Sequence, residues 1–412
     1  MTAPLVSAAV LLWIVAAGAA LAVAFRREIV RAWREPVLSA PVLIVESDDW
    51  GYGPLEQAEL LRRIAELLAR HRDHTGQPAV MTLGVILGGP DTERIAQAGC
   101  LRYERITLAD PPLQTIRAAM AAGTQERVFS LQLHAMEHFH PEVLLRAAER
   151  NPLVRSWLTA EALPQTEALP ARLQSRWIDA AALPSKPLAK GAVEAAAFEE
   201  VKAFESIFGV LPEVAVPPTF IWTPAVERAW AAAGVRVVVT PGRRYVGRDT
   251  AERPVPEAIR FHNAEHSPCG PVYLVRDDFF EPALGHRVER GMAAVATKTE
   301  LGRPTLLETH RANFLGDETK ALPALTELDR LLSEALKRWP ALRFMSSAQL
   351  ARHYAEHSDL IETRLLPRLH VSLLRLAQVP RLRKLSLASG VAVPFSLLLY
   401  ATRRTRVARM AF

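Results

Sequence analysis

The chain has 412 residues, half of them apolar and 23% charged, a composition typical of globular proteins that excludes wholesale disorder. Its length allows two average domains, or one α/β barrel with appended segments. The formal charge of +6 does not indicate a nucleic-acid partner, because ten Lys and Arg residues and no acidic residue follow position 363, which leaves −4 for the rest. Two cysteines, Cys100 and Cys269, are too few for a disulfide framework, although a single bridge stays open.

The first element is an apolar segment, residues 3–25, without a charged side chain. About 20 apolar residues suffice for a membrane-spanning helix. Four arginines follow it directly: Arg26, Arg27, Arg31 and Arg34. We therefore expect residues 1–35 to anchor the chain in a bacterial inner membrane. By the positive-inside rule, the arginines place the following domain on the cytoplasmic side. A cleaved signal peptide is the alternative, since residues 22–24 are similar to a cleavage site, and the exported side stays open.

Beyond the anchor, short apolar runs alternate with longer amphipathic stretches, which is the pattern of repeated βα units around a mostly parallel sheet. The predicted strands are residues 42–46, 79–86, 128–134, 214–216, 235–240, 272–275, 305–309 and 343–345. The predicted helices include residues 55–70, 113–122, 192–208, 224–233 and 322–338. We therefore expect a (β/α) barrel over residues 36–360, complete or with one degenerate unit. Its residues 151–190 are proline-rich and predict an irregular insert.

The last segment, residues 361–412, is basic and contains an apolar stretch at 385–401. Gly390 and Pro394 interrupt this stretch, so we expect it to lie in the membrane interface or to re-enter it. The basic residues on both sides would be attracted to anionic lipids, which makes membrane lipid an expected partner.

Four predicted strands end in ionisable residues, and the carboxyl ends of barrel strands line active sites. These residues are Asp48-Asp49, His134 with His138, Asp277-Asp278, and Glu308-Thr309-His310. Helix N-caps would explain one or two of the aspartates but not the histidines. On a helical turn, histidines four residues apart share one face and can share a metal ion. Two such rings, a carboxylate and an open position suit a catalytic zinc site.

These residues resemble the motifs of the polysaccharide deacetylase family, also called the nodulation-factor deacetylase homology domain. The family's first motif, a strand ending in two aspartates before a glycine, is similar to residues 45–49, with Trp50 before Gly51. Its second motif, two histidines four apart, is similar to His134 and His138, and its last to residues 307–310. The resemblance spans about residues 41–354 and implies a deformed (β/α) barrel.

The resemblance also implies a metal-dependent hydrolase that removes N-acetyl groups from a glycan or a lipid-linked sugar. Asp49, His134 and His138 would hold a divalent ion, with zinc expected and cobalt, nickel or iron as alternatives. Asp48 would be the general base. His310 would be the general acid that protonates the leaving amine.

Within the same resemblance, Asp277 occupies the position of an acid that orients His310. One family motif is incomplete, because residues 216–220 keep the prolines but lack the arginine that normally precedes them. The charge beside the base is therefore missing or comes from Arg276 or Arg311.

Two other functions stay open. A glycoside hydrolase could use Asp48, Asp277 and Glu308 as acid and nucleophile. A catalytically silent glycan-binding protein beside a glycan-synthesis machinery is the other. Four aromatic residues could form a sugar platform or pack in the core: Phe220, Trp222, Phe279 and Phe280.

Overall fold

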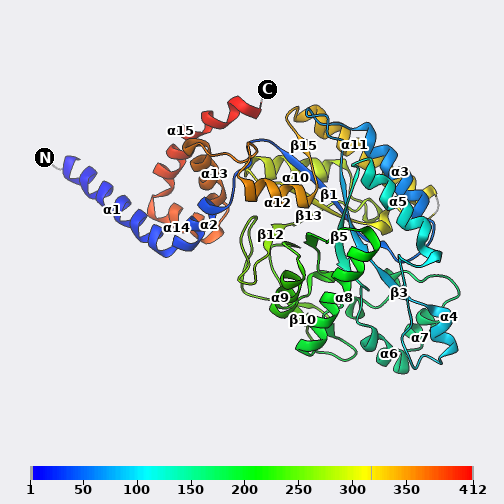
Figure 1. Cartoon of the computed structure of the whole chain (residues 1–412). Coiled ribbons are helices and arrows are strands. Elements are labelled where there is room, and N and C mark those ends of the chain that lie inside the picture. The colour runs from blue at the N-terminus through cyan, green and yellow to red at the C-terminus, as the bar shows by residue number, and fades with distance from the viewer. Residues whose placement is uncertain (1–2, 317, 411–412) are drawn as a thin grey trace.

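The computed structural model describes residues 3–316 and 318–410, and its centre is a parallel sheet surrounded by helices (Figure 1). The main path of the sheet is β12 (Val272–Val275), β9 (Val237–Thr240), β8 (Val214–Ala215), β5 (Phe129–Ala135), β2 (Met81–Ile86), β1 (Val42–Gly51), β14 (Thr305–His310) and β13 (Asp278–Phe279). A ninth strand, β15 (Arg343–Phe344), pairs with the start of β1. All these pairings are parallel, as repeated βα units require.

The two end strands of this path, β12 and β13, are consecutive in the sequence. Because only Arg276 and Asp277 join them, the sheet must curl until its two edges approach each other. Among the described residues, β12 and β13 are not hydrogen-bonded to each other. The barrel is therefore closed by the two-residue connection between these strands and not by strand pairing. This arrangement confirms the predicted deformed (β/α) barrel.

The outer helices follow the apolar periodicity of the sequence. They are α3 (Gln57–Arg70), α5 (Gln114–Gln125), α8 (Lys190–Phe208), α9 (Pro224–Ala233), α10 (Val288–Glu300), α11 (Glu318–Arg338) and α12 (Ser347–Glu356). In α3, Leu61, Ile64 and Leu68 repeat on one face and are fully buried against the sheet. Each such side chain stabilises the fold by roughly 1.5–3 kcal/mol. Every predicted strand is present, whereas β13 was missed because two residues carry no periodicity.

The region predicted as an irregular insert contains one short α-helix, α7 (Pro152–Leu158), two 3-10 turns, and an antiparallel pair of two-residue strands, β6 (Ile178–Asp179) and β7 (Lys186–Pro187). Trp157 and Leu158 of α7 share a small core with Phe139, and the Phe139 and Trp157 rings meet edge to face at 5.5 Å. Phe139 directly follows His138, so the insert packs beside one predicted metal ligand.

The chain ends gather into helices on one side of the barrel (Figure 1). They are α1 (Ala3–Ala24), α2 (Arg26–Arg34), α13 (Leu365–Ala377), α14 (Pro380–Ser389) and α15 (Ala392–Met410). Residues 5–24 have a mean hydropathy of 2.4 and none of them is buried, so α1 could serve as a membrane anchor or a signal sequence. The apolar stretch near the C-terminus is broken at Gly390, where α14 and α15 meet at 114°. Cys100 and Cys269 are both free.

These terminal helices dock on the amino edge of the barrel, where the strands begin. Glu35, just before β1, accepts two bonds from Arg303, just before β14, both at 2.7 Å. Arg375 of α13 is buried and donates to the carbonyl groups of Ala32, Glu35 and Gly302. The helices at the two ends of the chain are therefore fixed to each other and to the edge opposite the predicted active site.

Candidate metal centre and active site

The end of β1 directs its two aspartates into different surroundings. The pairing of β1 with β2 shifts register between Ser47 and Trp50, and Asp49 has a φ of 74°, a conformation that non-glycine residues rarely adopt. Asp48 occupies space left open by Gly84 of β2, because a Cβ added there would lie 2.4 Å from Asp48 Oδ1. The irregular backbone thus places two adjacent carboxylates at separate positions of one pocket.

His134 and His138 approach each other without a helix, contrary to the helical turn that the spacing argument assumed. His134 is in β5, and His138 lies in the bend that follows, where the chain folds back over the strand end. Their ring centroids are 5.0 Å apart. Glu137 between them is fully buried and forms ion pairs with Arg105 and Arg176, which hold the bend in place.

Asp49, His134 and His138 converge as the sequence predicted. One ligand atom of each lies within 4.8 Å of the others, and all three side chains are buried. The distances from Asp49 Oδ1 to the Nε2 atoms of His134 and His138 are 3.3 and 3.5 Å. His134 Nδ1 is 2.9 Å from the Val216 carbonyl and donates to it in the tautomer that leaves Nε2 as an acceptor.

The unsatisfied atoms of this cluster test whether it fits a metal ion. Asp49 Oδ1 and His134 Nε2 are buried and have no hydrogen-bond partner among the described residues. Such orphaned acceptors are costly unless a ligand satisfies them. Two imidazoles, one carboxylate and an open side suit a catalytic divalent ion such as zinc, so the residues fit one.

Arg276 supplies the positive charge that the incomplete motif lacks. Its guanidinium is fully buried and lies 3.2 and 2.5 Å from the two carboxylate oxygens of Asp48. The same group contacts Glu46 at 2.9 Å and Glu308 at 3.1 Å. Arg311, the other candidate, instead binds Glu167 of the insert and the Tyr52 carbonyl.

The electric environment of Asp48 and His138 follows from these contacts. Burial by itself would raise the pKa of Asp48, but Arg276 and His134 outweigh it and the pKa is lowered, so Asp48 is ionised at neutral pH. Burial is the largest influence on His138 and lowers its pKa to about 4 despite the Asp49 charge. His138 is therefore neutral at pH 7, which is the form that binds a metal.

His310 lies across the same pocket, but its partner is Glu281 and not Asp277. The distance from His310 Nδ1 to Glu281 Oε1 is 2.7 Å, and Asn313 also donates to the Glu281 carboxylate. Burial by itself would lower the pKa of His310. The bond to Glu281 and the charges of Asp49 and Asp48 outweigh this effect and raise the pKa to about 10. His310 therefore carries a proton at neutral pH, as a general acid must.

The structure does not bring Asp277 to His310, which corrects the role assigned to it by the sequence resemblance. Asp277 is half exposed and forms an ion pair with Lys298 of α10. Consecutive side chains of extended backbone point to opposite sides, so Arg276 enters the barrel and Asp277 leaves it. Asp277 is also absent from the lining of the active-site pocket.

The pocket that contains these groups has a volume of about 500 Å³ and opens at the carboxyl ends of the strands. Glu167 and Gln174 of the insert form one wall. Of the four aromatic residues, Trp222 and Phe280 are buried in the core, whereas Phe220 and Phe279 line the pocket, and Phe279 is 37% exposed. Of the four aromatic residues, only Phe220 and Phe279 are therefore placed where they could stack against a sugar ring.

No family model and no curated protein matches the chain. Among solved structures it is similar to a Mycobacterium smegmatis protein assigned as a polysaccharide deacetylase, at 12% identity, over 80% of this chain and 99% of that one, with a TM-score of 0.38. A family 4 acetyl xylan esterase from Clostridium thermocellum, solved in complex with a cobalt ion, has 10% identity, coverages of 78% and 94%, and a TM-score of 0.33. A 4-alpha-glucanotransferase from Thermococcus litoralis has 8% identity, coverages of 85% and 48%, and a TM-score of 0.39.

Similarity at this level does not assign residues. The roles of the residues in the pocket therefore follow from the geometry of this chain.

Proposed function

We propose that the protein is a metal-dependent hydrolase that removes N-acetyl groups from a glycan or a lipid-linked sugar. The observation that carries this proposal is the buried set Asp49, His134 and His138, with the ionised Asp48 and the protonated His310 in the same pocket. An ion site, a base and an acid are the groups that amide hydrolysis needs. The similarity of residues 45–49, 134–138 and 307–310 to the deacetylase motifs supports the same reaction.

A divalent ion held by Asp49, His134 and His138 would supply a Lewis acid that polarises the acetyl carbonyl and lowers the pKa of water. Asp48 takes a proton from the attacking water, whose oxygen forms a new bond to the carbonyl carbon. His310 gives its Nε2 proton to the amide nitrogen as the carbon–nitrogen bond breaks. The products are acetate and a free amine.

Two residues prepare this chemistry without reacting. Arg276 keeps Asp48 ionised and fixes its orientation through two bonds. Glu281 binds His310 Nδ1, which leaves the Nε2 proton directed away from Glu281. Phe279 and Phe220 offer apolar faces against which a sugar ring could stack.

The membrane part of the proposal is that α1 is retained as an anchor, with the barrel on the cytoplasmic side. Its length and its exposed apolar surface support the anchor, and the four arginines after it support the orientation. A reporter enzyme fused to the C-terminus, active only on one side of the membrane, tests the orientation.

Metal analysis and acetate release test the reaction. We expect the purified chain to contain about one divalent ion, and to release acetate from N-acetylglucosamine oligosaccharides until a chelator is added. His138→Ala should lose the ion and the activity, whereas His140→Ala, which removes a neighbouring histidine outside the ligand set, should keep both. Full activity of His138→Ala would refute the proposal. New reducing ends without acetate would identify a glycoside hydrolase instead.

A further inference from the structure

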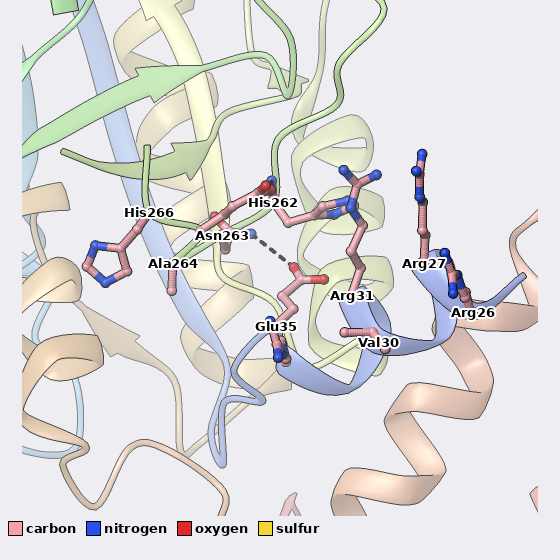
Figure 2. Close-up of a pocket in the computed structure, with 11 residues that line it drawn as sticks. Arg26, Arg27, Val30, Arg31, Glu35, His262, Asn263, Ala264 and His266 are labelled. Atoms are coloured by element: carbon pink, nitrogen blue, oxygen red, sulfur yellow. Dashed lines mark hydrogen bonds between the residues drawn. The ribbon is translucent and has the colours of Figure 1, made fainter. Parts of the chain in front are cut away.

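A second cavity, separate from the active site, lies where the anchor meets the barrel. Its volume is about 690 Å³, and it is enclosed by α2 on one side and by the loop of residues 262–266 on the other (Figure 2). On the barrel side, this cavity is bounded by the amino edge of the sheet. The cavity therefore lies on the side of the barrel opposite the metal centre. Nothing in the proposed hydrolysis uses it.

The cavity is lined by an unusual concentration of free positive charge: Arg26, Arg27, Arg31 and Arg34. All four side chains are exposed, and none forms an ion pair within the part of the chain that the structure describes. These four are therefore available to an anion from outside the protein.

The acidic groups of the cavity do not neutralise these arginines. The Glu35 carboxylate is bound by Arg303, lies 3.7 Å from Arg375, and accepts from Asn263 at 3.4 Å (Figure 2). Glu265 accepts the backbone N–H of His262 at 3.1 Å. Glu35, the residue that follows α2, also joins this helix to the loop through its bond from Asn263.

The position of the cavity indicates the anion. α1 ends at Ala24 and α2 begins at Arg26, so Arg26 and Arg27 directly follow the apolar span and lie within about 8 and 11 Å of Ala24 at about 3.8 Å per Cα step. With α1 in a bilayer, this is the depth of the phospholipid headgroups. Guanidinium groups bind phosphate through paired hydrogen bonds, and basic pockets beside a span bind lipid headgroups.

We propose that this cavity binds the phosphate-bearing headgroup of one anionic phospholipid, such as phosphatidylglycerol. The proposal rests on the proposed membrane anchor but not on the proposed hydrolysis. The bound lipid would fix α2, and with it the amino edge of the barrel, at the bilayer surface. Inorganic phosphate shares the recognised chemistry, so the test has to separate it from the lipid.

The test uses the full chain in neutral detergent and measures bound phosphatidylglycerol by native mass spectrometry and titration. Arg27→Gln together with Arg31→Gln should weaken binding about 30-fold, on the basis of roughly fivefold per arginine. Arg381→Gln together with Lys384→Gln, which removes two charges from α14 outside the cavity, should change it less than twofold. Phosphatidylcholine should bind much more weakly than phosphatidylglycerol.

Three outcomes would overturn the proposal. Equal weakening in both double variants would show unspecific attraction of basic residues to anionic lipid. Equal affinity for inorganic phosphate would show an anion site that does not require lipid. No saturable binding by the unchanged protein would show that the cavity is not a site. Two further measurements separate this proposal from the hydrolase proposal. Acetate release is measured for the double variant Arg27→Gln with Arg31→Gln, and lipid binding is measured for Asp49→Ala.

Discussion

Replacing Arg276 by methionine should destabilise the whole barrel, because its guanidinium is the shared partner of three buried carboxylates, Glu46, Asp48 and Glu308. Methionine fills much of the same volume but leaves these groups without a counter-charge. Removing one partner of a buried ion pair costs about 3–5 kcal/mol. Burial already raises the pKa of Glu46 and of Glu308, so protonation of these two limits the loss. We therefore expect the free energy of unfolding of Arg276→Met to fall by about 3–5 kcal/mol.

Arg276→Lys is the matched control, since it keeps the charge but cannot bind both oxygens of Asp48 in one plane. It should stay folded and keep its metal, while acetate release falls about 10- to 100-fold. Urea unfolding followed by fluorescence, on samples also used for metal analysis and acetate release, measures both effects. Arg276→Met with unchanged urea midpoint and unchanged activity would refute the assignment of Arg276 as the partner of Asp48.

Three further changes test other parts of the structure. Glu281→Gln should reduce acetate release about 100-fold by releasing His310, whereas Asp277→Asn should leave it within twofold; the reverse order would restore the role first given to Asp277. Gly84→Ala should displace the Asp48 carboxylate and lower kcat with little change in metal content, which a metal assay beside the kinetics would show. Burial raises the pKa of Glu200 to about 7, against 4.5 in an unfolded chain. Because the folded state then keeps a proton that the unfolded chain loses, stability should fall by about 3 kcal/mol as the pH rises from 4.5 to 7. Urea titrations should show a flatter profile for Glu200→Gln, and equal profiles would contradict this pKa.

The barrel and most of the pocket could be predicted from the sequence because strand ends carry their own signal. Apolar runs that end in Asp48-Asp49, His134 and His310 place these residues at one edge of any parallel sheet. The convergence of His134 and His138 was correctly predicted for a wrong reason, since a bend and not a helical turn brings the rings together. A four-residue spacing does not distinguish the two conformations.

The residues that the sequence could not assign depend on how the barrel closes. Arg276 and Asp277 are adjacent charged residues, and only the crossing from β12 to β13 determines that the first points inward and the second outward. Glu281 follows β13, a two-residue strand that is too short to recognise in the sequence. The contact between Glu281 and His310 could therefore not be predicted. The sequence assigned no role to Glu137, which is completely buried, pairs with Arg105 and Arg176, and thereby supports the bend that carries His138.

The docking of the terminal helices on the amino edge has a consequence for the proposed membrane anchor, because it sets the distance between the active site and the end of α1. From Val42 to Asp49 the extended β1 covers about 20 Å at roughly 3.3 Å per residue. With α1 in a bilayer, the barrel acts as a spacer that holds the mouth of the pocket at least this distance above the surface and facing outward. In that arrangement an acetyl group on a long glycan would reach the pocket more readily than one on a sugar attached directly to lipid phosphate. Within the proposed substrate class, an anchored α1 would therefore favour the distal part of membrane-bound glycans, or polymers in solution, over sugars held at the bilayer surface.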